Sequence, residues 1–186
     1  MKSNKFERLL SALASLAFLF FVLPIFFLLL PYKIITLKAQ VNTFQIDVIM
    51  DFFPELATFR FIGIVPILVG IVSYIWCTWS FTFSGRGTPV FGFPTEELVV
   101  SGLYRFVRNP IYVGACLILF GETLLFASAG LLIYASAWFI FFNFVVHGEE
   151  AYLRRKYGES YEQYCKSVHR WIPRLKPFRG YMSKSS

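Results

Sequence analysis

Charged residues are scarce in this sequence. Asp, Glu, Lys and Arg make up 16% of its 186 residues, whereas a soluble domain carries about 25%. Hydrophobic residues make up 56% and aromatic residues 20%, and 23 of them are phenylalanine. A composition this apolar is typical of a protein embedded in a membrane, because hydrocarbon does not penalise exposed apolar side chains.

Cysteine and histidine are also few, which limits metal and disulfide chemistry. Cys77 and Cys116 lie in apolar runs and Cys165 lies in a basic tail, so no two cysteines have the spacing of a zinc site or a disulfide framework. The two histidines, His147 and His169, are too few for a histidine-based metal centre. We therefore expect no metal site.

The chain carries a net charge of +7, from 18 Lys and Arg against 11 Asp and Glu. A basic soluble protein would point to nucleic acid. In a membrane protein the same excess is typical of cytoplasmic segments that face anionic lipid. We therefore expect the lipid bilayer, and not nucleic acid, as a partner.

Four long apolar runs predict an all-α integral membrane bundle with four transmembrane helices. The first follows a short basic head, and no small-residue cleavage site comes after it, so we favour a spanning helix bent at Pro24 over a signal peptide. The third contains Glu122, which we expect to be paired within the bundle. The four runs are residues 9–30, 61–81, 111–128 and 131–146.

The last two runs predict a tight helical hairpin, because only a few small residues separate them. The basic residues predict its orientation. Fifteen of the 18 lie in the N-terminal head, in the 82–110 loop or in the C-terminal tail, and basic residues are retained on the cytoplasmic side. We expect a multi-pass protein with both termini and this loop in the cytoplasm.

The tail has a helical pattern of its own. Gly158 is expected to divide it into two helices, and the segment "WIP" at 171–173 ends the pattern and suits an anchor at the membrane interface. Apolar and aromatic residues recur at intervals of three or four, which places them on one helical face. These residues are Leu153, Tyr157, Tyr161, Tyr164 and Val168.

Charges of both signs are expected to meet at the cytoplasmic end of the hairpin. Glu149 and Glu150 follow about sixteen uncharged residues, and a carboxylate at a membrane boundary is costly unless cations or donors meet it. Arg105 and Arg108 stand at the same depth on the neighbouring helix. One interpretation is a structural ion pair that locks the hairpin. The other is a binding site for a polar ligand with both charges, since a surface pair contributes only about 0–1 kcal/mol.

Two motifs bear on this choice. The stretches "LVVSGLYRFVRNPIYVG" at 98–114 and "EEAYLRRKYGESYEQYCKSVHRWIP" at 149–173 resemble the isoprenylcysteine carboxyl methyltransferase family and its phospholipid methyltransferase relatives. The resemblance covers about residues 85–175. It implies an integral-membrane methyltransferase that moves a methyl group from S-adenosylmethionine to a lipid or lipidated substrate. Residues 1–84 are then an N-terminal membrane region with two spans, 85–176 the methyltransferase-like region and 177–186 a disordered tail.

The resemblance also implies which residues contact S-adenosylmethionine. They are Leu98, Val99, Tyr104, Asn109, Pro110, Ile111, Tyr112 and Glu149. We add Glu150, the second carboxylate, and Arg108, whose charge suits the methionyl carboxylate. Such a carboxylate can accept from ribose hydroxyls or the amino group, and tyrosine rings can meet adenine or the sulfonium.

The acceptor and the base stay open. In that family an arginine one turn before the acidic pair contacts the substrate carboxylate, and Val145 stands there here. An amine or another lipid headgroup is therefore an alternative to prenylcysteine. No catalytic residue is assigned, although Glu150, His147 and Tyr104 are candidate bases. A sterol-reductase-like NADPH oxidoreductase and a non-catalytic membrane scaffold are the alternatives from other functional classes.

Overall fold

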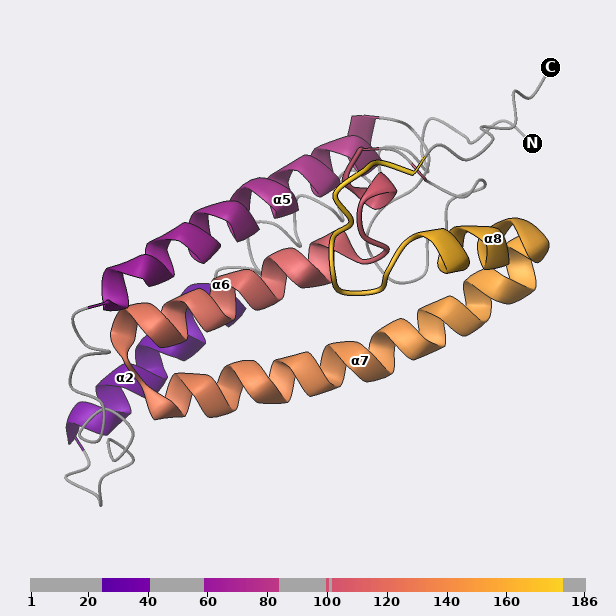
Figure 1. Cartoon of the computed structure of the whole chain (residues 1–186). Coiled ribbons are helices and arrows are strands. Elements are labelled where there is room, and N and C mark those ends of the chain that lie inside the picture. Colours follow the sequence, from indigo (N-terminus) through magenta and orange to yellow (C-terminus); the bar gives the residue numbers. More distant parts are fainter. Residues whose placement is uncertain (1–24, 41–58, 84–99, 101, 179–186) are drawn as a thin grey trace.

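The regular structure is helical throughout the described part of the chain. The computed structural model describes residues 25–40, 59–83, 100 and 102–178 (Figure 1). Its long helices are α2 (Leu30–Gln40), α5 (Ile64–Phe83), α6 (Pro110–Phe126), α7 (Ala129–Tyr157) and α8 (Glu159–Ser167). Short helical turns precede three of them, at Ile25–Leu29, Arg60–Gly63 and Gly102–Arg105. The all-α prediction is confirmed for these residues.

The apolar runs coincide with helices to different degrees. The second and third runs match α5 and α6 to within a few residues. The fourth covers only the first part of α7, which continues to Tyr157 through the good helix formers of "EEAYLRRK". Most of the first run, residues 9–24, lies outside the described residues, as do residues 179–186 of the expected disordered tail; the helix that begins at Ile25 extends past residue 30 to Gln40.

Two of the described helices are long and apolar enough to cross a membrane, namely the segment Arg60–Cys77 and α7. Only 22% and 17% of their apolar windows is buried, whereas the core helix of a soluble protein is mostly buried. Large side chains such as Val72 and Trp76 are more than half exposed on α5. Apolar surface of this extent needs a non-aqueous neighbour.

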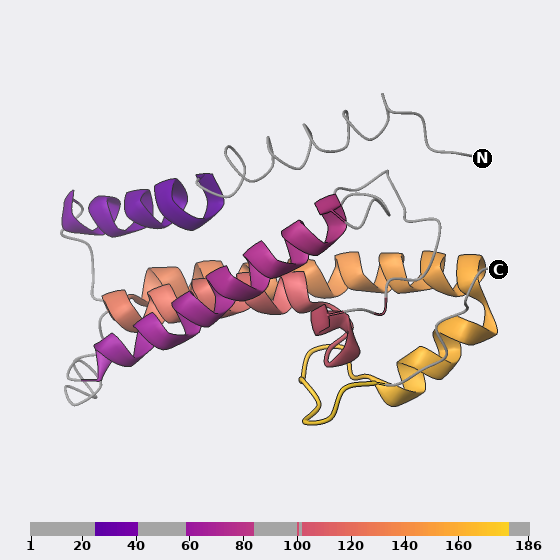
Figure 2. The same ribbon diagram turned by 90° about the horizontal axis from the view of Figure 1, so that it is seen from above.

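Glycine allows α5 and α6 to pack with their backbones in contact (Figures 1 and 2). A Cβ atom built on Gly70 would lie 2.5 Å from the carbonyl oxygen of Gly114, and one built on Gly121 would lie 2.8 Å from that of Gly63. Small residues at such interfaces are the common way for membrane helices to associate. Gly70 of α5, Gly63 of the turn before it, and two glycines of α6 thus form the contact.

The chain reverses between α6 and α7, which then run back beside each other (Figure 1). Only Ala127 and Ser128 separate the two helices, and Ala127 has a left-handed backbone with φ 49°. The Ser128 hydroxyl accepts from the backbone N–H of Leu131 and so caps the start of α7. The short turn brings the part of α7 around Glu149 to the level of the first turn of α6, where Tyr112 meets it, and α7 continues beyond that level to Tyr157.

The residues after α7, from Gly158 onward, fold back on the segment before α6. Gly158, at φ 54°, ends α7, which confirms the predicted break. The predicted apolar face is confirmed as well, since Tyr161, Tyr164 and Val168 are buried and pack with Leu153 and Tyr157.

The C-terminal segment, residues 168–178, then crosses the residues before α6. Backbone N–H groups of Arg174 and Phe178 donate to the carbonyls of Phe106 (2.9 Å) and Arg105 (2.8 Å). This crossing places the C-terminal segment beside the entrance to α6.

Substitution of Gly70 tests the α5–α6 contact. Gly70→Ala should lower the free energy of unfolding by about 1–3 kcal/mol, because the new methyl group collides with backbone that cannot move aside. Gly148→Ala is the matched control, since a Cβ at Gly148 meets nothing within 4 Å, and it should raise stability by about 0.5–1 kcal/mol. Thermal unfolding in detergent measures both, and equal effects would contradict the packing.

Candidate functional site

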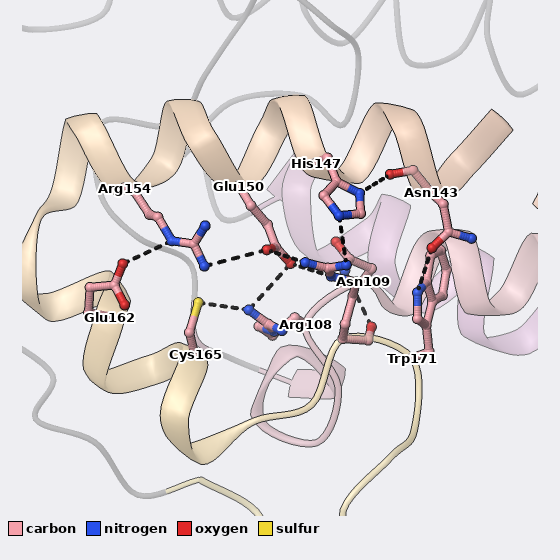
Figure 3. Close-up of polar contacts among 10 residues, drawn as sticks. Arg108, Asn109, Asn143, His147, Glu150, Arg154, Glu162, Cys165 and Trp171 are labelled. Atoms are coloured by element: carbon pink, nitrogen blue, oxygen red, sulfur yellow. Dashed lines mark hydrogen bonds and ion pairs between the residues drawn. The ribbon is translucent and has the colours of Figure 1, made fainter. Parts of the chain in front are cut away.

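Glu150 is the most buried charged side chain at the place where α7 meets the C-terminal segment. Its side chain is 3% exposed. Arg170 meets it with two parallel bonds, Nε to Oε1 at 2.9 Å and Nη2 to Oε2 at 2.8 Å. Arg108 Nη1 lies 3.3 Å from Oε1, and Arg154 Nη2 lies 3.8 Å from Oε2 (Figure 3).

These contacts make Glu150 the centre of an arginine cluster. A buried carboxylate is stable as an ion only when cations and donors surround it, and the fork geometry of arginine meets both oxygens at once. Hydrogen bonding to Glu150 raises the pKa of the Arg170 guanidinium, so this cation stays charged. For Glu150 and Arg108 the geometry is that of the structural ion pair.

Glu149, the neighbouring carboxylate, has a different partner. The hydroxyl of Tyr112, on the first turn of α6, donates to Glu149 Oε1 at 2.8 Å. The Tyr112 ring also packs against Phe142 of α7, with ring centroids 5.1 Å apart. The structure therefore brings together Tyr112 and Glu149, two of the residues predicted for the site. Successive helical residues point about 100° apart, which explains why Glu149 and Glu150 face different neighbours.

Tyr104 belongs to the short helical turn before α6. Its carbonyl accepts from the Tyr164 hydroxyl at 2.7 Å, which ties the turn to the buried face of the tail. Burial raises the pKa of the Tyr104 hydroxyl well above its ordinary value. Near neutral pH this group stays protonated, so it is a hydrogen-bond donor and not a base.

Asn109 and Pro110 form the entrance to α6. The backbone of Asn109 lies outside the helical region (φ −124°, ψ 60°), which agrees with the steric restriction on a residue before proline, and Pro110 occupies the first helical position. The Asn109 side chain makes no capping bond to the helix; its Nδ2 donates to the Arg170 carbonyl at 3.3 Å instead. The first backbone N–H groups of α6, beginning at Ile111, therefore receive no side-chain cap from Asn109.

His147 is held by two neighbours at an exposed position of α7. Its Nδ1 lies 2.6 Å from the carbonyl oxygen of Asn143, and its Nε2 lies 3.3 Å from Arg170 Nη1. Because a carbonyl only accepts and an arginine only donates, Nδ1 carries the proton and Nε2 accepts. Arg170 thus occupies the lone pair with which His147 would act as a base.

Several contacts lie beyond what sequence reasoning identified. Arg170 and Arg154 reach Glu150 from the tail, and Arg108 Nη1 donates to Cys165 Sγ at 2.8 Å. The four-residue spacing of Glu150 and Arg154 is a signal in the sequence, because such residues meet on one face of a helix. Arg170 lies beyond the helix, and its position carries no information about which carboxylate it meets. Leu98 and Val99 lie outside the described residues.

Two polar atoms at the site lack a bond within the described residues. Arg108 Nε is buried and has no hydrogen-bond partner there. Glu149 uses Oε1 for Tyr112, and none of the described residues donates to its Oε2. A buried donor without a partner is costly, so a bound polar group fits here.

Removal of Arg170 tests the arginine cluster. Arg170→Gln should lower the free energy of unfolding by about 2 kcal/mol, because hydrogen bonds to a buried charge contribute about 1.5–3 kcal/mol. Arg154→Gln is the control. Arg154 is exposed, and its Nε pairs with Glu162 Oε1 at 2.9 Å. Because exposed ion pairs contribute little, we expect little change in the free energy of unfolding. Denaturant unfolding measures both, and similar losses would show that Glu150 does not depend on Arg170.

Comparison with known proteins gives a consistent result. The chain is 39% identical over 77 residues to the protein-S-isoprenylcysteine O-methyltransferase of Schizosaccharomyces pombe, which covers 41% of this chain and 33% of that one. It is 28% identical over 126 residues to a probable protein-S-isoprenylcysteine O-methyltransferase of Oryza sativa subsp. indica, covering 65% of this chain and 66% of the rice protein. No solved structure matches.

The chain thus spans a third of the yeast relative and just under two thirds of the rice relative. A protein family also matches the chain. Residues 58–160, which contain all of α5, α6 and α7, match the family described as phospholipid methyltransferase. This match covers more than half of the sequence, and the chain belongs to the phospholipid methyltransferase family.

Proposed function

We propose that the chain is an integral-membrane methyltransferase that uses S-adenosylmethionine to methylate a lipid or lipidated acceptor. The family match and the names of the relatives, which are isoprenylcysteine O-methyltransferases, support this function. We also propose the four-span topology, with the site at the cytoplasmic face. The exposed apolar surfaces of α5 and α7 and the basic residues at one end of the bundle support it.

The contact between Tyr112 and Glu149 carries the proposal. It joins the first turn of α6 to the polar part of α7 through a 2.8 Å hydrogen bond. The bond holds one oxygen of Glu149 in place and leaves Oε2 as an oriented acceptor. A carboxylate prepared in this way can accept from two hydroxyls of a ribose or from an ammonium group with charge assistance.

The other groups of the site suit the remaining parts of S-adenosylmethionine. Arg108 Nε is a donor for a carboxylate, and the first N–H groups of α6 lie where the helix dipole favours a negative group. Tyr104 contributes a protonated hydroxyl from the turn before α6. We therefore expect this surface to hold the cofactor.

When bound, S-adenosylmethionine supplies a methyl group on a positively charged sulfur, ready for direct displacement. The residues of this chain have to align the acceptor and exclude water. A carboxylate acceptor is itself the nucleophile and needs no base. An amine acceptor has to lose a proton, and the described contacts of Glu150 and His147 already occupy both groups.

Ligand binding tests the site. S-adenosylhomocysteine should raise the melting temperature of the detergent-solubilised protein. Glu149→Gln should weaken its binding about 10–100-fold, because a charge-assisted hydrogen bond contributes about 1.5–3 kcal/mol. Tyr112→Phe should weaken it less, since the carboxylate remains.

The matched control is Glu159→Gln, which neutralises an exposed carboxylate at the start of α8. Its binding should equal that of the wild type. Unchanged binding in Glu149→Gln would rule out the assigned site. Stabilisation by NADPH in place of S-adenosylhomocysteine would instead favour a reductase.

Membranes incubated with methyl-labelled S-adenosylmethionine identify the acceptor. We expect label in the lipid-soluble fraction, and less of it with Glu149→Gln. Release of volatile methanol in base would show a methyl ester and hence a carboxylate acceptor, as in isoprenylcysteine. Label that resists base and remains in phospholipid would show an amine acceptor. Label confined to water-soluble products would contradict the proposal.

A further inference from the structure

A basic pocket lies on the C-terminal segment, apart from Tyr112 and Glu149. It has a volume of about 760 Å³ and is open to the surface. Its lining consists of Lys166, Ser167, Arg174, Lys176, Pro177 and Phe178. We call residues 166–178 the basic loop.

Arg170 of the basic loop meets Glu150, but the cations that line the pocket have no such carboxylate partner among the described residues. Lys166 and Lys176 form no ion pair within the described part of the chain, and Arg174 donates to the carbonyl of Ser167 at 2.8 Å. The sequence has no acidic residue after Glu162. Cations gathered without a counter-charge attract an anion. The pocket is therefore chemically suited to a phosphate group.

Apolar side chains project from the same loop. Ile172 is 72% exposed and Leu175 is 99% exposed. In the sequence "RWIPRLKP" they alternate with arginine and lysine, as in segments that lie at a membrane surface. A soluble anion would not require exposed apolar side chains beside the cations, whereas a lipid offers a partner to both.

Trp171 places the loop at the boundary of the apolar part of α7. Its indole Nε1 donates to Asn143 Oδ1 at 3.2 Å (Figure 3), and its ring packs against Phe139 with centroids 5.3 Å apart. Both partners precede Val146, the last residue of the apolar run. The loop therefore lies at the depth where the apolar surface of α7 ends, which is where tryptophan is enriched in membrane proteins.

We propose that the basic loop binds the phosphate headgroup of an anionic membrane lipid. Lys166 and Lys176 contact the phosphate, and Ile172 and Leu175 enter the boundary between headgroups and acyl chains. The loop is bonded through Arg174 and Phe178 to the segment that leads into α6. Bound lipid thus holds this segment against the membrane. The proposal requires the membrane setting but not methyl transfer.

A fluorophore on the loop tests the insertion. Leu175→Cys is labelled in the full chain, with the three native cysteines replaced, and the protein is placed in nanodiscs that contain a spin-labelled quencher lipid. Ser160→Cys, at an exposed position of α8, is the reference label. Quenching should be several-fold stronger at position 175 and should increase as phosphatidylglycerol replaces phosphatidylcholine.

Charge variants test the pocket. Lys166→Gln and Lys176→Gln should each raise the phosphatidylglycerol fraction needed for half-maximal quenching about fivefold, since each basic residue near an anionic surface contributes about 1 kcal/mol. Arg155→Gln removes an exposed charge outside the pocket and should have no such effect. Binding of S-adenosylhomocysteine should persist in all three variants, which separates this test from that of the methyltransferase site.

Three results would overturn the proposal. Equal quenching at positions 160 and 175 would show that the loop stays in water. An equal effect of Arg155→Gln would show general attraction by positive charge and no defined pocket. Reproduction of the phosphatidylglycerol effect by inorganic phosphate in neutral nanodiscs would show a site for a soluble anion.

Discussion

The buried carboxylate of Glu150 is the group on which the polar end of this protein depends. It lies on α7, and it is met by Arg108 from the segment before α6 and by Arg170 from the C-terminal segment. Three parts of the chain that are far apart in sequence therefore converge on one charge. An isolated buried ion is costly in free energy. Displacement of any one of the three segments would leave a buried charge without its partner and would destabilise the other two. The arrangement of the remaining site follows from this constraint.

The two adjacent glutamates divide two roles that sequence reasoning had considered as alternatives for one cluster. Glu150 is saturated by cations and stabilises the structure. Glu149 faces Tyr112, which donates to Oε1, and no described residue donates to its Oε2. A structural ion pair and the proposed binding site can therefore lie side by side, because neighbouring residues of a helix face different directions. The second role is the one that methyl transfer would use.

The position of the candidate site suits the proposed reaction between a soluble donor and a lipophilic acceptor. The Gly70–Gly114 contact holds α5 close to α6 and leaves large apolar side chains exposed on the outside of the bundle. The polar groups gather at one end of these helices, beside Trp171 and the exposed side chain of Leu175. A membrane-facing scaffold and a charged end thus meet in a chain of 186 residues.

The sequence by itself determined what depends on local pattern. Apolar runs predicted α5 and α6, three- and four-residue spacing predicted the buried face of Tyr161 and Tyr164, and the quoted motifs pointed to the family. Only the tertiary structure decided that Arg170 meets Glu150, because an ion pair between residues of a loop and a helix leaves no periodic signal in the sequence. The partner of a charge is set by how the chain folds back, and that is a property of packing.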